Sequence, residues 1–141
     1  MTFDQADYFL VPLLDGQFGV GQILEADSHV PFCALTALRV TPQAVINPFS
    51  AGDIIAFVRI SPAGLRSGTW PLAGFDQIPT FRHLIDYDGS KALDFPDHPI
   101  HDPAVIEAFL SAWHGLYPWD AFGDLFEKIK RTDLDRPIAA T

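Results

Sequence analysis

The sequence is poor in cysteine and has no long apolar run. Its 141 residues contain one cysteine, Cys33, which excludes an internal disulfide and has no neighbour at metal-ligand spacing. We expect it to be a small buried side chain. No apolar run reaches the roughly 18 residues of a membrane helix, and the first residues are acidic where a secretory signal carries Lys or Arg. We therefore expect a cytoplasmic protein without a membrane contact.

Cationic side chains are also scarce. Nine Lys and Arg face eighteen Asp and Glu, which gives a net charge of −9. The first Lys or Arg is Arg39, and five acids precede it: Asp4, Asp7, Asp15, Glu25 and Asp27. Such a surface repels phosphate backbones, so we expect no nucleic-acid binding, and it attracts a basic partner. The alternative is that the acidic surface only keeps the protein soluble and has no specific partner.

Apolar and aromatic residues are plentiful, at 48% and 13% of the chain, so the sequence can build a core. The length predicts a single domain over residues 1–141. Its pattern divides into a mainly β part (8–75), an irregular loop region rich in Asp and His (76–101), two helices (102–131) and a tail (132–141), of which 136–141 should be frayed.

The first two predicted strands form a hairpin. Tyr8 to Leu14 and Gln17 to Leu24 flank Asp15-Gly16, a pair typical of a two-residue turn in which both residues have positive φ.

Gly19 and Gly21 fall on one face of the second strand of this hairpin. The two missing side chains leave a furrow, which allows a close strand crossing, tight coiling of the sheet, or an aromatic ring lying on the backbone. Tight coiling is what a small barrel or half-barrel requires.

Three further strands are predicted at His29 to Val40, Asp53 to Ile60 and Leu65 to Ala73. The segment 41–52 between the first two of these carries two prolines and reads as a loop. No stretch up to residue 75 shows helical periodicity. The sequence therefore predicts an antiparallel, strongly coiled β-meander of about five strands, similar to a half-barrel.

The remaining pattern is helical. Asp102 and Pro103 are typical of an N-cap and a first helical position, and apolar residues follow at helical spacing until Gly115. A second helix should begin near Pro118, with Phe122, Leu125, Phe126 and Ile129 on one face. The predicted class is α+β, with two amphipathic C-terminal helices covering one face of the sheet.

Catalytic and metal-binding patterns are weak. The segment 83–102 holds three His and five Asp, and His98, His101 and Asp102 lie close in sequence. Pro99 and Pro103 prevent the helix that would bring the two His to one face, so we expect no metal and no cofactor, with metal binding by 83–102 left open. Nucleophile elbows and phosphate-binding glycine loops are also missing from the sequence, so we do not expect an enzyme.

The opening stretch carries a resemblance. The run from Pro12 to Leu24 has an acidic-Gly turn, an aromatic residue and a Gly-x-Gly; its marked positions are Pro12, Asp15, Gly16, Phe18, Gly19 and Gly21. Later pieces run from Trp70 to Gly74 and from Ile78 to Phe81. This pattern resembles the immunity protein 26 family over roughly residues 8–85. The resemblance implies a bacterial protein of a polymorphic-toxin system that binds and neutralises a toxin by occlusion, without catalytic residues.

Charge suggests how such binding would work. An acidic face would attract a basic nuclease toxin and imitate the phosphates of its substrate. The candidate face comprises the acids of the N-terminal strands and a cluster with two aromatic anchors: Asp86, Tyr87, Asp88, Asp94, Phe95 and Asp97.

Two other classes stay open. One is an accessory or scaffold subunit that packs its helices on another chain through Phe109, Trp113, Trp119 and Phe122. The other is a small-molecule or metal-dependent enzyme that uses the histidines. The toxin's identity and the oligomeric state stay open as well.

Overall fold

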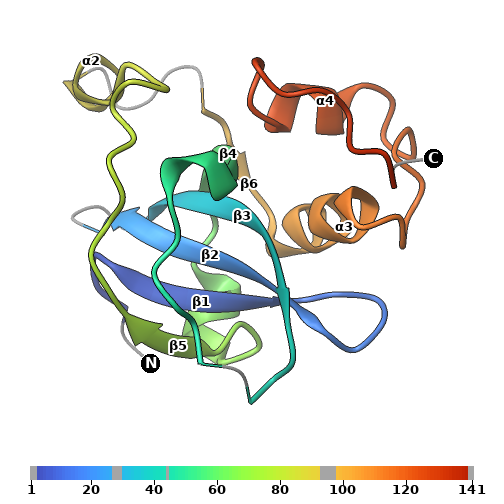
Figure 1. Cartoon of the computed structure of the whole chain (residues 1–141), viewed down its shortest axis with the longest axis horizontal. Coiled ribbons are helices and arrows are strands. Elements are labelled where there is room, and N and C mark those ends of the chain that lie inside the picture. Colours follow the sequence, from blue (N-terminus) through green and yellow to red (C-terminus); the bar gives the residue numbers. More distant parts are fainter. Residues whose placement is uncertain (1–2, 27–29, 44, 93–97, 140–141) are drawn as a thin grey trace.

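The computed structural model describes residues 3–26, 30–43, 45–92 and 98–139. Within them the chain is α+β, with one six-stranded mixed sheet and four α-helices (Figure 1). The strands are β1 (Asp7–Pro12), β2 (Phe18–Glu25), β3 (Phe32–Val40), β4 (Ile54–Ile60), β5 (Leu72–Phe75) and β6 (Ile100–His101). They lie in the order β5-β1-β2-β3-β4-β6, so β5 and β6 are the two edges of an open sheet.

The hairpin of β1 and β2 forms with the expected partners, but its turn is longer than expected. Leu13 N donates to the Gln17 carbonyl oxygen at 2.9 Å, which leaves residues 14–16 in the loop. Gly16 alone in this loop has a positive φ, +85°, so the prediction of two positive-φ residues was wrong. A three-residue loop needs only one left-handed residue, and glycine supplies it. Asp15 is instead held by an ion pair with Arg39.

The fifth strand was placed wrongly. Ala63–Ser67 forms the short helix α1, which ends at Gly68 with φ +81°. After it, β5 pairs antiparallel with β1 instead of extending the meander beyond β4. The meander therefore has four strands, β1 to β4. A helix of five residues is too short to show apolar periodicity, so the sequence could not separate it from a strand.

The region expected to be irregular contains two elements. The first is helix α2 (Tyr87–Ala92), whose buried residue is Tyr87. The second is β6, which pairs in parallel with β4 through Arg59↔Ile100 and Ile60↔His101. This parallel pair makes the sheet mixed.

The helix predicted from Asp102 and Pro103 is α3 (Pro103–Trp113). The second helix was predicted to begin near Pro118, which was wrong: α4 spans Leu125–Ile129 only. Residues 118–124 form successive turns. In them, Ala121 N, Gly123 N and Leu125 N each donate a hydrogen bond to the carbonyl oxygen of the residue three positions earlier. In Figure 1, α3 and α4 lie together beside the sheet, away from α2.

Both faces of the sheet are covered. On one face, strand residues such as Val11, Ile23 and Leu35 form the largest core cluster with Ile106 and Phe109 of α3. Cys33 is buried in the same cluster, as expected. The opposite face is covered by loops and α2, whose buried or partly buried apolar residues are Ile46, Phe49, Phe81, Leu84 and Tyr87.

The furrow beside the two glycines is filled by side chains. A Cβ on Gly21 would lie 2.3 Å from Cζ of Phe9, its cross-strand partner, so the tip of that ring occupies the missing side chain's place. The Phe9 ring stacks on Trp70 with 5.6 Å between centroids and 6° between planes. Trp70 also lies against Gly64, where a Cβ would be 3.1 Å from Cγ of the indole. The sequence allowed a close strand crossing, tight coiling of the sheet, or an aromatic ring on the backbone. At Gly21 the structure shows the aromatic ring.

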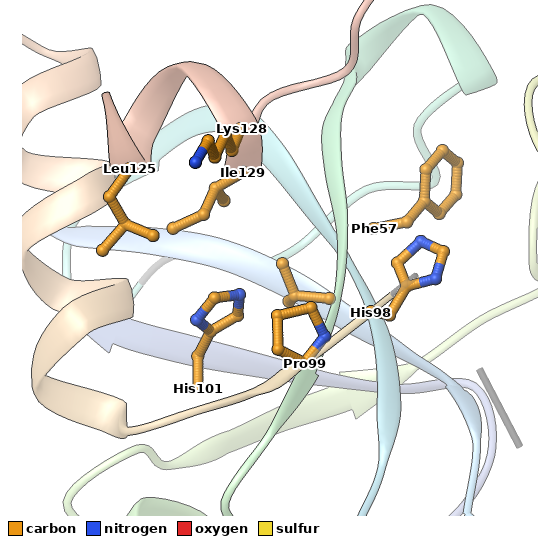
Figure 2. Close-up of a pocket in the computed structure, with 8 residues that line it drawn as sticks. Phe57, His98, Pro99, His101, Leu125, Lys128 and Ile129 are labelled. Atoms are coloured by element: carbon orange, nitrogen blue, oxygen red, sulfur yellow. The ribbon is translucent and has the colours of Figure 1, made fainter. Parts of the chain in front are cut away.

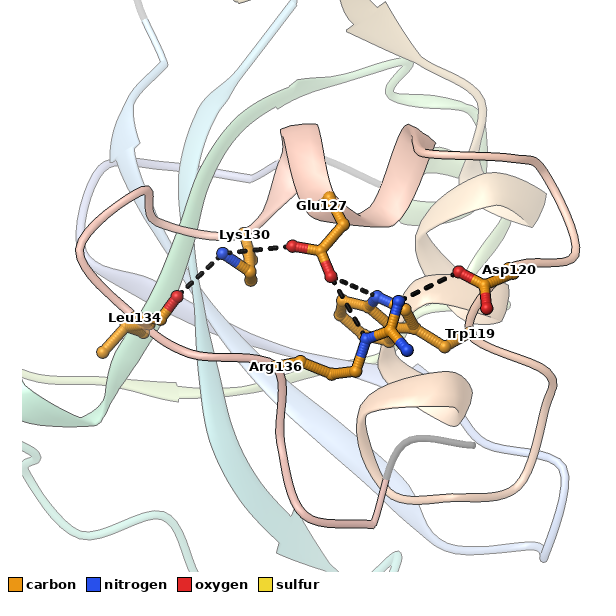
Figure 3. Close-up of polar contacts among 6 residues, drawn as sticks. All are labelled: Trp119, Asp120, Glu127, Lys130, Leu134 and Arg136. Atoms are coloured by element: carbon orange, nitrogen blue, oxygen red, sulfur yellow. Dashed lines mark hydrogen bonds and ion pairs between the residues drawn. The ribbon is translucent and has the colours of Figure 1, made fainter.

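The chain end is fixed, at least through Arg136, so the expectation of a frayed tail from 136 was wrong for this residue. Glu127 accepts hydrogen bonds from Trp119 Nε1 at 2.8 Å and Arg136 Nε at 3.2 Å (Figure 3). Arg136 also donates to Asp120 at 3.0 Å, and Lys130 Nζ donates to the Leu134 carbonyl oxygen at 2.7 Å. These contacts hold residues 134–136 against α4.

Replacing the two glycines should have unequal effects. Gly21→Ala should lower the free energy of unfolding by about 1–3 kcal/mol, because the Phe9 ring is fully buried and stacked on Trp70, which leaves it little room to move away. Gly19→Ala should cost less than about 1 kcal/mol, because its nearest neighbour, 2.9 Å away, is the flexible end of Leu110. Urea unfolding of both variants measures this difference. Equal losses of unfolding free energy in the two variants would contradict the conclusion that the Phe9 ring fills the furrow at Gly21.

Candidate functional site

The acidic cluster predicted as a binding face is only partly within the described residues. Asp94, Phe95 and Asp97 lie outside them. Asp86 and Asp88 are exposed at the start of α2. Asp86 accepts a hydrogen bond from Gly89 N at 3.2 Å, and Asp88 has a loose ion pair with Arg82 at 3.4 Å. Both carboxylates therefore remain open to solvent.

Tyr87 does not serve as a surface anchor, so that part of the expectation was wrong. It is 5% exposed and packs edge-on against Phe81, with centroids 5.2 Å apart. Its hydroxyl donates to Oε2 of the buried Glu25 at 3.0 Å, and Lys91 Nζ lies 2.5 Å from the same oxygen. Burial and Glu25 raise the pKa of Tyr87. These contacts attach α2 to the end of β2.

The motif residues behind the family resemblance shape the backbone or fill the core. Pro12 and Phe18 are the last cross-strand partners before the hairpin loop. Trp70 is buried and donates its Nε1 proton to Glu107 of α3 at 2.8 Å. Gly74 has φ +96° within β5, a conformation that favours glycine.

An exposed aromatic residue does occur on the sheet edge formed by β5. Phe75 is 77% exposed at the end of this strand, directly across from Asp7 in the register of β1 and β5. Asp76 follows it in the chain, and Asp4 N donates to Asp7 Oδ2 at 2.7 Å. We call Asp4, Asp7, Phe75 and Asp76 the edge patch.

Charge in the edge patch is uncompensated by the described residues. Among them, no Lys or Arg forms an ion pair with Asp4, Asp7 or Asp76. Burial and the negative charge of Asp76 both raise the pKa of the Tyr8 hydroxyl.

A buried amide holds the two halves of the edge patch together. Gln22 of β2 is fully buried and donates to the carbonyl oxygens of Ala6 at 3.1 Å and Asp76 at 2.9 Å. One side chain thereby joins the segment before β1 to the segment after β5. The signal in the sequence was a single amide among the apolar residues of this strand, and sequence reasoning missed its role.

The aromatic residues proposed for scaffold binding are mostly internal. Phe109 and Trp119 are buried and contact each other with 5.9 Å between centroids, and Trp113 is half-buried. Phe122 is the exception at 48% exposure. Most of this set therefore builds the chain's own core.

No protein-family model, curated protein or solved structure matches the chain. In the described ranges, no three His, Cys, Asp or Glu side chains are grouped as metal ligands. Those same ranges contain no helix with the length and apolar character of a bilayer span.

Two half-buried histidines should make the fold sensitive to mild acid. Burial and the neighbouring His98 lower the pKa of His101 below its ordinary value of 6.5. Burial and the Arg39 guanidinium lower the pKa of His114, although Asp15 opposes this shift. The folded chain thus resists proton uptake at both imidazoles.

Stability should fall as the pH drops from about 7 to about 5, because the unfolded chain binds protons at His101 and His114 that the folded chain does not. A second loss should follow below about pH 4.5, where the lowered pKa values of Asp15, Glu127 and Asp133 leave the folded state with fewer protons. NMR titration of the two imidazoles should give midpoints below 6.5. Midpoints above that value, with stability constant down to pH 5, would refute the expectation.

Proposed function

We propose that this chain is an immunity-type protein that neutralises a basic protein toxin by occlusion and binds it through the edge patch. One observation carries the proposal: Phe75 is largely exposed at a sheet edge, across from Asp7 and next in the chain to Asp76. Asp4 is hydrogen-bonded to Asp7, and none of the three carboxylates has an ion-pair partner among the described residues. The family resemblance of the sequence and the net charge of −9 agree with this reading.

An exposed aromatic ring within a polar surface is typical of a binding anchor. Aromatic side chains dominate the energetics of many protein interfaces because they bury a large area at low entropic cost. Phe75 is held by the register of β5 on β1, so little order has to be gained when a partner covers it.

The carboxylates would set the choice of partner. Unpaired acids around an apolar centre steer a basic surface toward it and raise the association rate. They also offer a nuclease the type of charge that its phosphate substrate carries. Neutralisation would then follow from blocked access to the toxin's active site.

The geometry of the edge favours side-chain contacts over strand addition. The pairing of β1 and β5 is irregular between Asp7 and Phe9, and Gly74 departs from extended backbone. Such irregularity disfavours the pairing of a further strand. A partner would therefore contact the carboxylates and the ring.

The test uses the immobilised protein and lysate of the source organism at low salt and at about 1 M salt, where the screening length falls to about 3 Å. A retained basic protein should lose its toxic activity when this chain is added. Phe75→Ser should weaken its binding at least about tenfold, as for an interface anchor. Replacing Asp4, Asp7 and Asp76 by Asn should slow association and remove most of the salt dependence.

Leu14→Ser is the matched control. Leu14 is also a largely exposed apolar residue, but it lies beyond the opposite end of β1, in the hairpin loop. This variant should bind normally. If Phe75→Ser and the Asn variant bind as tightly and as fast as the unaltered chain, the edge patch is not the toxin-binding surface. A neutral partner held equally at both salt concentrations would favour a scaffold role instead.

A further inference from the structure

A second candidate site lies at the other edge of the sheet. A cavity of about 220 Å³ opens between α4 and the β4–β6 edge (Figure 2). Its polar lining is His98, His101 and Lys128, and its apolar lining includes Pro99, Leu125 and Ile129. Because β5 and β6 are opposite edges, this cavity is separate from the edge patch.

The polar and apolar groups of the cavity come from different elements and face one space. Figure 2 shows Leu125 and Ile129 extending from α4 toward His101 and Pro99 on the facing strand segment. The Lys128 ammonium lies on the α4 side of the same space. A ligand here would meet a cation, imidazole N–H groups and an apolar wall together.

A second cavity adjoins the first and shares part of its polar lining. This adjoining cavity of about 200 Å³ shares His98 and Lys128 and adds the charged residues Lys130, Arg131 and Asp133. Lys130 and Arg131 are held by protein groups, since Lys130 donates to the Leu134 carbonyl oxygen and Arg131 pairs with Asp133. Lys130 also pairs with Glu127 at 3.4 Å, so both cations already have acidic partners and offer few free donors to a ligand.

Lys128 differs from these two cations. Its ion-pair partner in the described chain is Asp124, at 3.5 Å, and both side chains are more than 70% exposed. An ion pair this exposed contributes little, so a ligand anion can compete for the ammonium. Burial and His98 lower the pKa of His101, which leaves that imidazole neutral near pH 7 with one N–H to donate.

We propose that the cavity binds a small carboxylate with a short apolar body. The carboxylate accepts hydrogen bonds from Lys128 Nζ and from an imidazole N–H, and the apolar body packs against Leu125, Ile129 and Pro99. A volume of about 220 Å³ suits a small acid, because larger ligands occupy pockets of roughly 300–1,000 Å³. This site is independent of the toxin-binding proposal.

The test is an NMR titration of the full chain, carrying isotope-labelled histidine, with benzoate at neutral pH. Benzoate should shift the resonances of His98 and His101 in a saturable way. Benzyl alcohol lacks the charge and inorganic phosphate lacks the apolar body, so each should bind at least about tenfold more weakly.

Lys128→Gln should weaken benzoate binding at least about tenfold, because it removes the charged donor. Arg66→Gln is the matched control: Arg66 is exposed on α1, outside the cavity lining, and its loss changes the net charge equally. It should leave the affinity unchanged. The proposal is overturned by the absence of saturable shifts with benzoate, by phosphate binding as well as benzoate, or by undiminished binding to the Lys128→Gln variant.

Discussion

The ring of Phe9 lies on the backbone of Gly21 and against the indole of Trp70, which itself lies on Gly64. Four residues from β1, β2, α1 and the segment before β5 therefore share one packed column. At Gly21 a Cβ would enter the space of the Phe9 ring, and at Gly64 a Cβ would lie 3.1 Å from the indole, which is tighter than an ordinary contact. The rest of the β5 edge depends on this column.

The position of the edge patch depends on the packing of Trp70, because contacts of this residue and the next one position β5. Trp70 is joined to α3 through Glu107, and the next residue, Pro71, accepts a hydrogen bond from Leu10 N at 2.9 Å. These contacts place β5 beside β1, which puts Phe75 across from Asp7. The indole thus connects the core to the surface that we propose for toxin binding.

Local patterns predicted the parts of the fold that rest on local physics. The strands β1 to β4 follow from apolar runs separated by turn and proline residues, and the start of α3 follows from the Asp102-Pro103 signal. The partner of β5 could not be predicted, because the connection through the short helix α1 carries the chain from β4 to β1, a strand far from β4 in the sheet. The parallel pairing of β6 rests on two residues and leaves no pattern in the sequence.

The candidate site was harder to predict than the fold because exposure depends on distant contacts. Tyr87 lies among acids in the sequence and looks like a surface anchor, yet its hydroxyl reaches Glu25 at the end of β2. Phe75 becomes an exposed residue only because β5 is an edge strand. Net charge could indicate a basic partner, but it could not indicate that Asp7 would lie across from an exposed aromatic residue.

The most direct test of the central packing is a double-mutant cycle between positions 9 and 21, measured by urea unfolding. Phe9→Leu replaces the ring by a shorter side chain and makes room for a Cβ at position 21. Gly21→Ala should therefore cost much less unfolding free energy in that background. We expect the combined loss of unfolding free energy to be smaller than the sum of the single losses by at least about 1 kcal/mol. Additive losses would mean that the Phe9 ring does not occupy the place left by Gly21, and the dependence of the β5 edge on this column would be wrong.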